Sequence, residues 1–173
     1  MRAGGQVVRL ALVALVATGC TETGIRPTST MQASDTADQI LEQAELVVTK
    51  VNDLLEAGVA ANQIGVITPY AAQARLLREK LLMSDLEIDT VDGFQGREKE
   101  AIVISLVRSN ERGEIGFLSD LRRMNVAMTR ARRELLVIGD SATLSADPFY
   151  ARLIAHFESQ GAYHTVWEED GAA

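Results

Sequence analysis

Residues 64–82 read IGVITPYAAQARLLREKLL, and this stretch carries the pattern that decides the fold. Ile64–Thr68 is short and apolar and is stopped by Pro69, which predicts a buried strand. The apolar spacing of residues 71–82 predicts an amphipathic helix. A buried strand that is followed at once by a helix is the repeating unit of an α/β sheet.

The same alternation continues on both sides of this unit. Upstream, apolar residues recur at steps of three and four from Asp35 to Ala57, which predicts a helix ended by Gly58. Further strands are expected at 87–91, 101–106, 134–138 and 163–167, and helices at 119–131 and 148–160. The pattern predicts an α/β domain with a mainly parallel sheet, helices on both faces, and ligands beyond the carboxyl ends of the strands.

The apolar run Leu10–Ala17 permits two interpretations. Eight consecutive apolar residues rich in Leu and Val are typical of a central parallel strand. Arg2 and Arg9 precede the run, however, and the sequence ATGC ending at Cys20 resembles a lipoprotein cleavage box, so a secretion signal is the alternative. A polar linker follows. We therefore expect an N-terminal segment over 1–34 and the main domain over 35–173.

Composition and charge exclude several classes of protein. The 173 residues include 17 Lys and Arg against 24 Asp and Glu, a formal charge of −7, so any nucleic-acid site must be local. One cysteine and two histidines exclude a disulfide framework, and we expect no metal site. No stretch reaches the ~20 apolar residues of a membrane span, so we expect no stable membrane span.

The first polar motif is Thr90–Glu98, TVDGFQGRE, directly after a predicted strand. Glycine lets a backbone approach a ligand closely, and Gln or Glu beside it can bond a ribose or a phosphate. From the residues alone, a tight turn with solvated charges remains the alternative.

The second motif is LRRMNVAMTRARR over residues 121–133, where five arginines gather in an acidic chain. Such a concentration of guanidinium groups suits recognition of phosphate or carboxylate. The alternative is a helix whose Leu and Met side chains face the core while the arginines are solvated or salt-bridged.

Together these stretches resemble superfamily-1 helicases of the group that includes the RNA-surveillance and immunoglobulin-mu-binding helicases. Residues 90–98 resemble motif V, and NVAMTRAR at Asn125–Arg132 resembles motif VI. Ile64–Gln73 is similar to the motif IV region, and Leu135–Tyr150 to the end of the same domain. The resemblance runs in order from about Glu45 to Trp167, and it implies a three-layer RecA-like fold of the P-loop NTPase type.

In this family ATP lies between two RecA-like domains, and the second domain supplies an arginine finger. By position in the motif, the resemblance makes Arg130 the catalytic finger, with Gly96 and Glu98 beside it as ATP-binding residues. It implies binding of single-stranded DNA or RNA through four further positions: Thr90, Gln95, Pro69 and Tyr70.

Neither G-x-x-x-x-G-K-[ST] nor a strand-ending Asp-Glu pair for magnesium occurs, because in the family both belong to the first RecA-like domain. We therefore expect the C-terminal motor domain of a cytoplasmic ATP-dependent helicase, a fragment or split-gene product that is inactive alone. Its partner would be a first RecA-like domain that carries the P-loop and holds ATP and Mg²⁺. The alternative is a non-catalytic nucleic-acid or protein-binding module derived from a helicase fragment.

Overall fold

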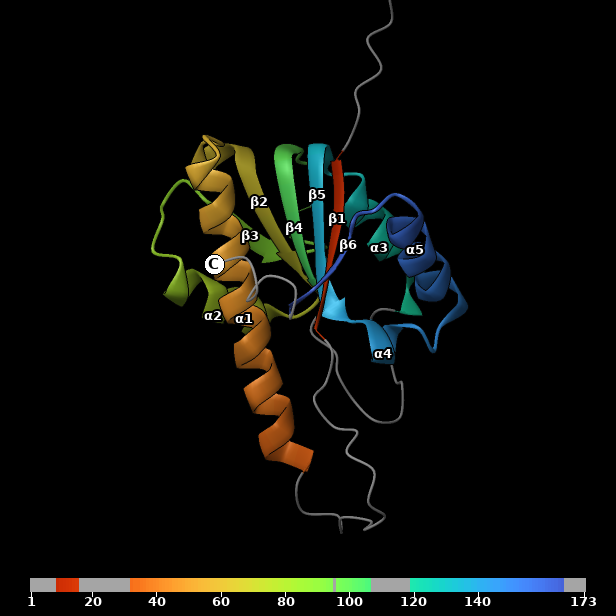
Figure 1. The fold of residues 1–173 in the computed structure, drawn as a ribbon. Coiled ribbons are helices and arrows are strands. Elements are labelled where there is room, and N and C mark those ends of the chain that lie inside the picture. Colours follow the sequence, from red (N-terminus) through yellow and green to blue (C-terminus); the bar gives the residue numbers. More distant parts are fainter. Residues whose placement is uncertain (1–8, 16–31, 95, 107–118, 167–173) are drawn as a thin grey trace, which may run out of the picture.

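The computed structural model describes residues 9–15, 32–94, 96–106 and 119–166. In this part of the chain six strands form one sheet in the order β3-β2-β4-β5-β1-β6, and every neighbouring pair is parallel (Figure 1). The strands are β1 Arg9–Leu15, β2 Ile64–Thr68, β3 Glu87–Thr90, β4 Lys99–Leu106, β5 Ala131–Asp140 and β6 Tyr163–Thr165. The helices are α1 Gln32–Glu56, the 3-10 turn η1 Ala61–Gln63, α2 Ala71–Lys80, α3 Leu121–Met128, α4 Ser141–Leu144 and α5 Pro148–Ser159.

Helices cover both faces of the sheet, so the domain has the three layers expected. Helices α1 and α2 lie on one face, and α3 and α5 lie on the other (Figure 1). Side chains alternate between the two faces along β4: Ala101 and Val103 pack with α1 and α2, whereas Ile102 and Ile104 pack with α3 and α5. The expected α/β class with a parallel sheet is confirmed.

The N-terminal apolar run contributes a strand, β1, which pairs with β5 and β6. This is the strand alternative of the two interpretations; Cys20 lies outside the described residues. No described helix combines the length and the apolar character that crossing a membrane requires.

The expected elements recur with shifted boundaries. The largest difference is that the expected helix over 119–131 ends at Met128, and β5 begins at Ala131 instead of 134. The cause is pairing across the sheet, since Ala131 lies opposite Lys99 at the start of β4. The short helix α4 was not expected. Gly58 follows α1 with φ of 90°, a conformation that favours glycine, as predicted.

One connection in the sheet is unusually direct. Strands β3 and β4 are parallel and have β2 between them, so the chain must return along the sheet within the eight residues 91–98, here called the crossover segment. Such returns usually need a dozen residues or more and a helix. Here Phe94, which is fully buried, packs over Gly65 of β2, where an added Cβ would lie 2.5 Å from the ring. The missing side chain at Gly65 therefore makes room for the crossover.

Candidate functional site

The expected site residues divide between the two edges of the sheet. Pro69 and Tyr70 directly follow β2, and Thr90 ends β3, so all three lie at the carboxyl edge, where the strands end. Gly96 and Glu98 precede β4 and Arg130 precedes β5, which places them at the amino edge, where these strands begin. Gln95 lies outside the described residues.

Three of the candidate residues, Gly96, Glu98 and Arg130, therefore lie away from the carboxyl ends of the strands, where the fold class predicts ligands. Strand β4 has eight residues, so at ~3.3 Å per residue the two edges are on the order of 25 Å apart. The crossover segment begins at one edge and ends at the other. Helix α3 likewise starts near the carboxyl edge, and Arg130, which follows it, lies just before the start of β5.

Arg130 is partly buried at the amino edge and is held from two sides. Its Nε donates a hydrogen bond to the carbonyl oxygen of Val126 at 3.1 Å. Its own carbonyl oxygen accepts from the backbone N–H of Lys99 at 3.0 Å, which docks the end of α3 onto β4. Within the described ranges no carboxylate lies within 4.0 Å of its guanidinium nitrogens. The group is therefore oriented without being neutralised.

The neighbouring Arg132 and Arg133, in contrast, are paired with carboxylates. Arg132 donates from Nε to Glu98 at 3.2 Å and also lies 3.6 Å from Glu100, while Arg133 pairs with Glu100 at 3.0 Å. Arg132 and Arg133 are therefore salt-bridged, as the alternative interpretation expected, although they lie in β5 and not in a helix. Arg130 differs from them in having no acidic partner among the residues described.

Gly96 lies beside this charged edge with φ of 81°, a left-handed conformation that glycine adopts without strain. An added Cβ there would meet no atom within 4 Å, so the backbone faces open space. An accessible backbone at the edge that also carries the Arg130 guanidinium is a suitable surface for a phosphate-bearing ligand.

At the carboxyl edge, Thr90 organises the start of the crossover segment. Its hydroxyl accepts a hydrogen bond from the N–H of Gly93 at 3.2 Å, and its own N–H donates to Asp89 at 2.8 Å. Tyr70 is the N-cap residue of α2, and its side chain makes no capping hydrogen bond.

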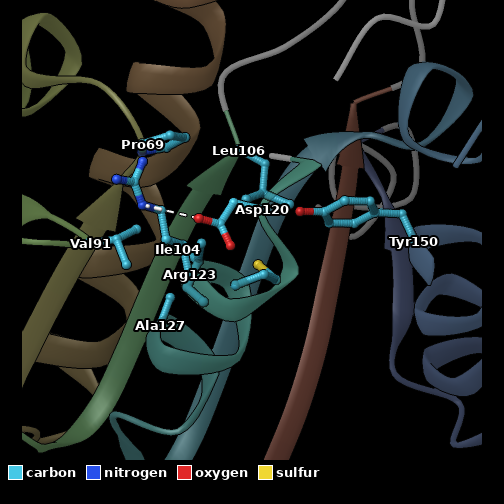
Figure 2. A pocket seen from close by; sticks show the side chains of 9 residues that line it. Pro69, Val91, Ile104, Leu106, Asp120, Arg123, Ala127 and Tyr150 are labelled. Atoms are coloured by element: carbon cyan, nitrogen blue, oxygen red, sulfur yellow. Dashed lines mark ion pairs between the residues drawn. The ribbon is translucent and has the colours of Figure 1, made fainter. Parts of the chain in front are cut away.

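Beside these residues lies a largely apolar hollow that the sequence did not indicate (Figure 2). Its wall includes Pro69, Val91, Leu106, Met124, Ala127 and Tyr150. At its rim, Arg123 pairs with Asp120 at 3.5 Å and with Asp92 at 3.3 Å. Burial, with a smaller contribution from Asp147, raises the pKa of the Tyr150 phenol well above its usual value. The apolar wall and the paired rim do not form an anion site.

Acidic side chains do not assemble into a metal centre in the part of the chain that the structure describes. Asp140, the buried acid at the end of β5, accepts from the hydroxyl of Thr143 at 2.6 Å and from the N–H of Ala142 at 3.0 Å. It therefore caps α4.

Comparison with known proteins identifies the family of this chain. Residues 17–142 match a protein family described as AAA domain. The DNA-binding protein SMUBP-2 of Rattus norvegicus is 48% identical over 128 residues, which cover 73% of this chain and 13% of that protein. The DNA polymerase alpha-associated DNA helicase A of Saccharomyces cerevisiae is 50% identical over 108 residues, 59% of this chain and 16% of the helicase.

A third relative, regulator of nonsense transcripts 1 of Dictyostelium discoideum, is 44% identical over 125 residues, 67% of this chain and 9% of its own length. The chain thus spans only a small part of these relatives. A solved C-terminal domain of a possible DNA helicase from Lactobacillus plantarum aligns over 93% of this chain and 86% of its own, with 13% identity and a TM-score of 0.47.

Proposed function

Since this chain belongs to the AAA domain family and is a C-terminal domain of the superfamily-1 helicase type, we propose that it is the second half of an ATP-driven motor. The motor tracks single-stranded DNA or RNA, and this half supplies an arginine finger. The observation that carries the proposal is Arg130, which is held at the same edge of the sheet as Gly96 and Glu98, without an acidic partner among the described residues.

The amino edge fits a nucleotide held by another domain. Bound ATP with Mg²⁺ supplies the phosphoryl group whose transfer is the chemical step. Arg130 is oriented in advance by the carbonyl of Val126, and an oriented guanidinium stabilises the negative charge that develops during this transfer. The carboxylate of Glu98 is fixed by Arg132 and can accept a hydrogen bond from a ribose hydroxyl.

The carboxyl edge is the proposed contact with the nucleic-acid backbone. The Thr90 hydroxyl already accepts from Gly93, so its proton remains to be donated to a phosphate oxygen. Pro69 and Tyr70 lie at the end of the neighbouring strand β2. Because the chain carries a charge of −7, binding through such local contacts is weaker and less salt-dependent than binding by a basic surface.

The test is reconstitution. The 173-residue chain is mixed with a separately produced first RecA-like domain that carries a P-loop, and ATP hydrolysis is measured with and without a single-stranded oligonucleotide. Hydrolysis is expected only when both polypeptides are present. Hydrolysis by this chain alone would contradict the proposal. Oligonucleotide binding with no hydrolysis in any mixture would instead support the second candidate, a non-catalytic binding module.

A further inference from the structure

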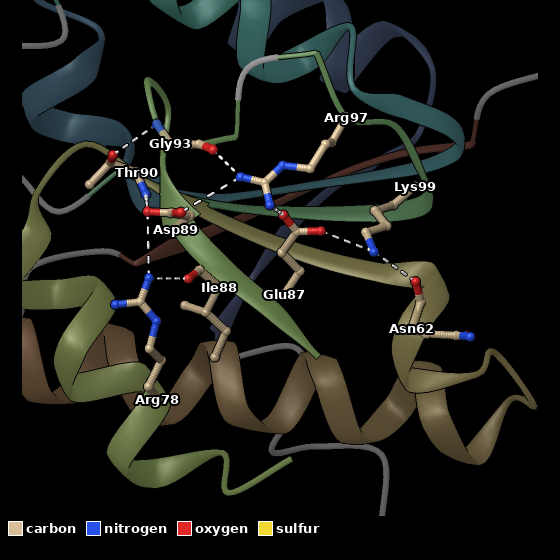
Figure 3. Close-up of polar contacts among 9 residues, drawn as sticks. All are labelled: Asn62, Arg78, Glu87, Ile88, Asp89, Thr90, Gly93, Arg97 and Lys99. Carbon is tan, nitrogen blue, oxygen red and sulfur yellow. Dashed lines mark hydrogen bonds and ion pairs between the residues drawn. The ribbon is translucent and has the colours of Figure 1, made fainter. Parts of the chain in front are cut away.

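The Arg97 side chain connects the crossover segment to the edge strand β3 (Figure 3). Its guanidinium forms an ion pair with Glu87, lies 3.8 Å from a carboxylate oxygen of Asp89, and donates to the carbonyl of Gly93. Its central carbon also lies 5.4 Å from the centre of the Phe94 ring. One side chain thus contacts two residues of β3 and two residues of the segment to which it belongs.

The carboxylates that hold Arg97 are themselves held in place. Glu87 also pairs with Lys99 at 3.1 Å, and Lys99 donates to the carbonyl of Asn62 at 2.8 Å (Figure 3). Asp89 is also 3.4 Å from Arg78 of α2. A planar guanidinium can bind several such fixed acceptors at once, whereas an ammonium group is a single point charge.

The contacts of Arg97 reach both ends of the crossover segment. The N–H of Gly93 bonds the hydroxyl of Thr90 at the carboxyl edge, and the carbonyl of Gly93 accepts from Arg97. Arg97 itself stands between Gly96 and Glu98 at the amino edge. Arg97 is therefore bonded through its side chain to Gly93, near Thr90, and adjoins Gly96 and Glu98 through its backbone.

We propose that Arg97 is a positioning residue that couples the nucleic-acid edge to the nucleotide edge by fastening Gly93 and its own backbone to Glu87 and Asp89. The inference rests on the proposed function, because it assigns the nucleic acid to Thr90 and the nucleotide to Gly96 and Glu98. Arg97 is half exposed, with 49% of its side chain accessible, so its ion pairs contribute little to global stability. Arg97 instead determines the position of the crossover segment.

The first test needs no ligand. Amide hydrogen exchange is compared in the wild-type chain and in Arg97→Gln. We expect exchange at residues 93–98 to become about tenfold faster, a ~1.4 kcal/mol local effect, with the amides of β4 and β5 and the melting temperature little changed. Unchanged exchange at 93–98, or equal loosening of the whole sheet, would overturn the inference.

Two variants sharpen this test. Arg78→Gln also removes a partner of Asp89. Because Arg78 contacts β3 and not the crossover segment, exchange at residues 93–98 should stay as in the wild type. Arg97→Lys keeps the positive charge but replaces the planar guanidinium with a single ammonium group. The exchange rate at residues 93–98 should therefore lie between those of the wild type and Arg97→Gln. Faster exchange at 93–98 in Arg78→Gln, equal to that in Arg97→Gln, would assign the effect to Asp89 and overturn the role of Arg97.

The second test follows ¹⁵N amide signals while a thymidine oligonucleotide is added. In the wild type, the signals of Gly96 and Glu98 should shift together with those of Thr90 and Gly93. In Arg97→Gln, Thr90 and Gly93 should shift with a Kd within about threefold of the wild type, an effect under ~1 kcal/mol, while Gly96 and Glu98 no longer respond. If they respond equally in both proteins, the inference is wrong. If nothing shifts in the wild type, the proposed nucleic-acid site fails, and the exchange experiment still decides on Arg97.

Discussion

The two edges of the sheet differ in the partners of their arginine side chains. At the carboxyl edge, Arg123 closes a rim with Asp120 and Asp92 around an apolar hollow. At the amino edge, Arg132 is likewise paired with a carboxylate, that of Glu98, whereas Arg130 donates to the backbone carbonyl of Val126 and meets no carboxylate in the part of the chain that the structure describes. Among arginines so close in sequence, the difference that matters is therefore the partner and not the charge.

The comparison also shows how one short motif can serve both edges. Because the crossover segment has no helix, nine consecutive residues from Thr90 to Glu98 pass from one edge to the other. Phe94 on Gly65 holds the middle of this path, and Arg97 holds it against β3. The two proposed sites are thus distant in space and adjacent in sequence.

The largest effect is expected at the amino edge. Arg130→Ala should lower kcat of the reconstituted ATP hydrolysis by about 10³-fold or more, because a transition-state charge loses its guanidinium. Oligonucleotide affinity, measured by fluorescence anisotropy, should not change, since the proposed nucleic-acid site lies at the other edge. Arg133→Ala is the matched control and should retain activity. A similar loss in both variants would show that the edge acts through bulk charge.

A substitution in the middle of the crossover segment should affect both edges together. Phe94→Ala empties a fully buried position and should lower the free energy of unfolding by about 3–5 kcal/mol in urea titrations. Phe157→Ala removes an equally buried ring from α5 and is the control for lost stability. Under conditions where both variants are folded, only Phe94→Ala should separate the amide shifts at Thr90 from those at Gly96. Coupling that persists in Phe94→Ala would contradict this account of the crossover.

Much of this arrangement could be predicted from the sequence. The apolar run Ile64–Thr68 predicts a strand whose bounds recur in β2, and the helical spacing of residues 71–82 predicts a helix that recurs in α2 but ends two residues earlier, at Lys80. Motif resemblance selected Arg130 and Thr90, and both lie at the ends of strands or helices, where a ligand can reach them. Local pattern suffices where burial follows the period of a strand or a helix.

The division between edges could not be predicted, because no local pattern shows that residues 91–98 recross the sheet. That path depends on Phe94 meeting Gly65, a contact between residues distant in sequence. The available signal was length: an eight-residue link between two parallel strands is too short for a helix. In the sequence Arg97 is one residue of the motif with no role of its own, since its four contacts exist only in the folded chain.

At the carboxyl edge a smaller effect is expected. Thr90→Ala removes the proposed phosphate donor and the acceptor of the Gly93 N–H, so oligonucleotide affinity should fall about fivefold, or ~1 kcal/mol. Thr90→Ser retains the hydroxyl and should bind as the wild type does. Equal affinities for all three proteins in anisotropy titrations would remove Thr90 from the site.

The smallest effect is expected for the paired arginines. Arg132 is half exposed, so Arg132→Ala should change the free energy of unfolding by less than ~1 kcal/mol. Its consequence should appear as a higher KM for ATP, because Glu98 loses the partner that orients it. A change in kcat as large as that of Arg130→Ala would contradict the contrast drawn between the two side chains.

The separation of the two edges is tested most directly by photo-crosslinking. The 173-residue chain is irradiated with a single-stranded oligonucleotide that carries 5-iodouracil, and the linked peptides are identified by mass spectrometry. Crosslinks at Pro69–Tyr70 or at Thr90–Gly93 are the predicted result. Crosslinks concentrated at Gly96, Glu98 or Arg130 would place the nucleic acid at the amino edge and contradict the account.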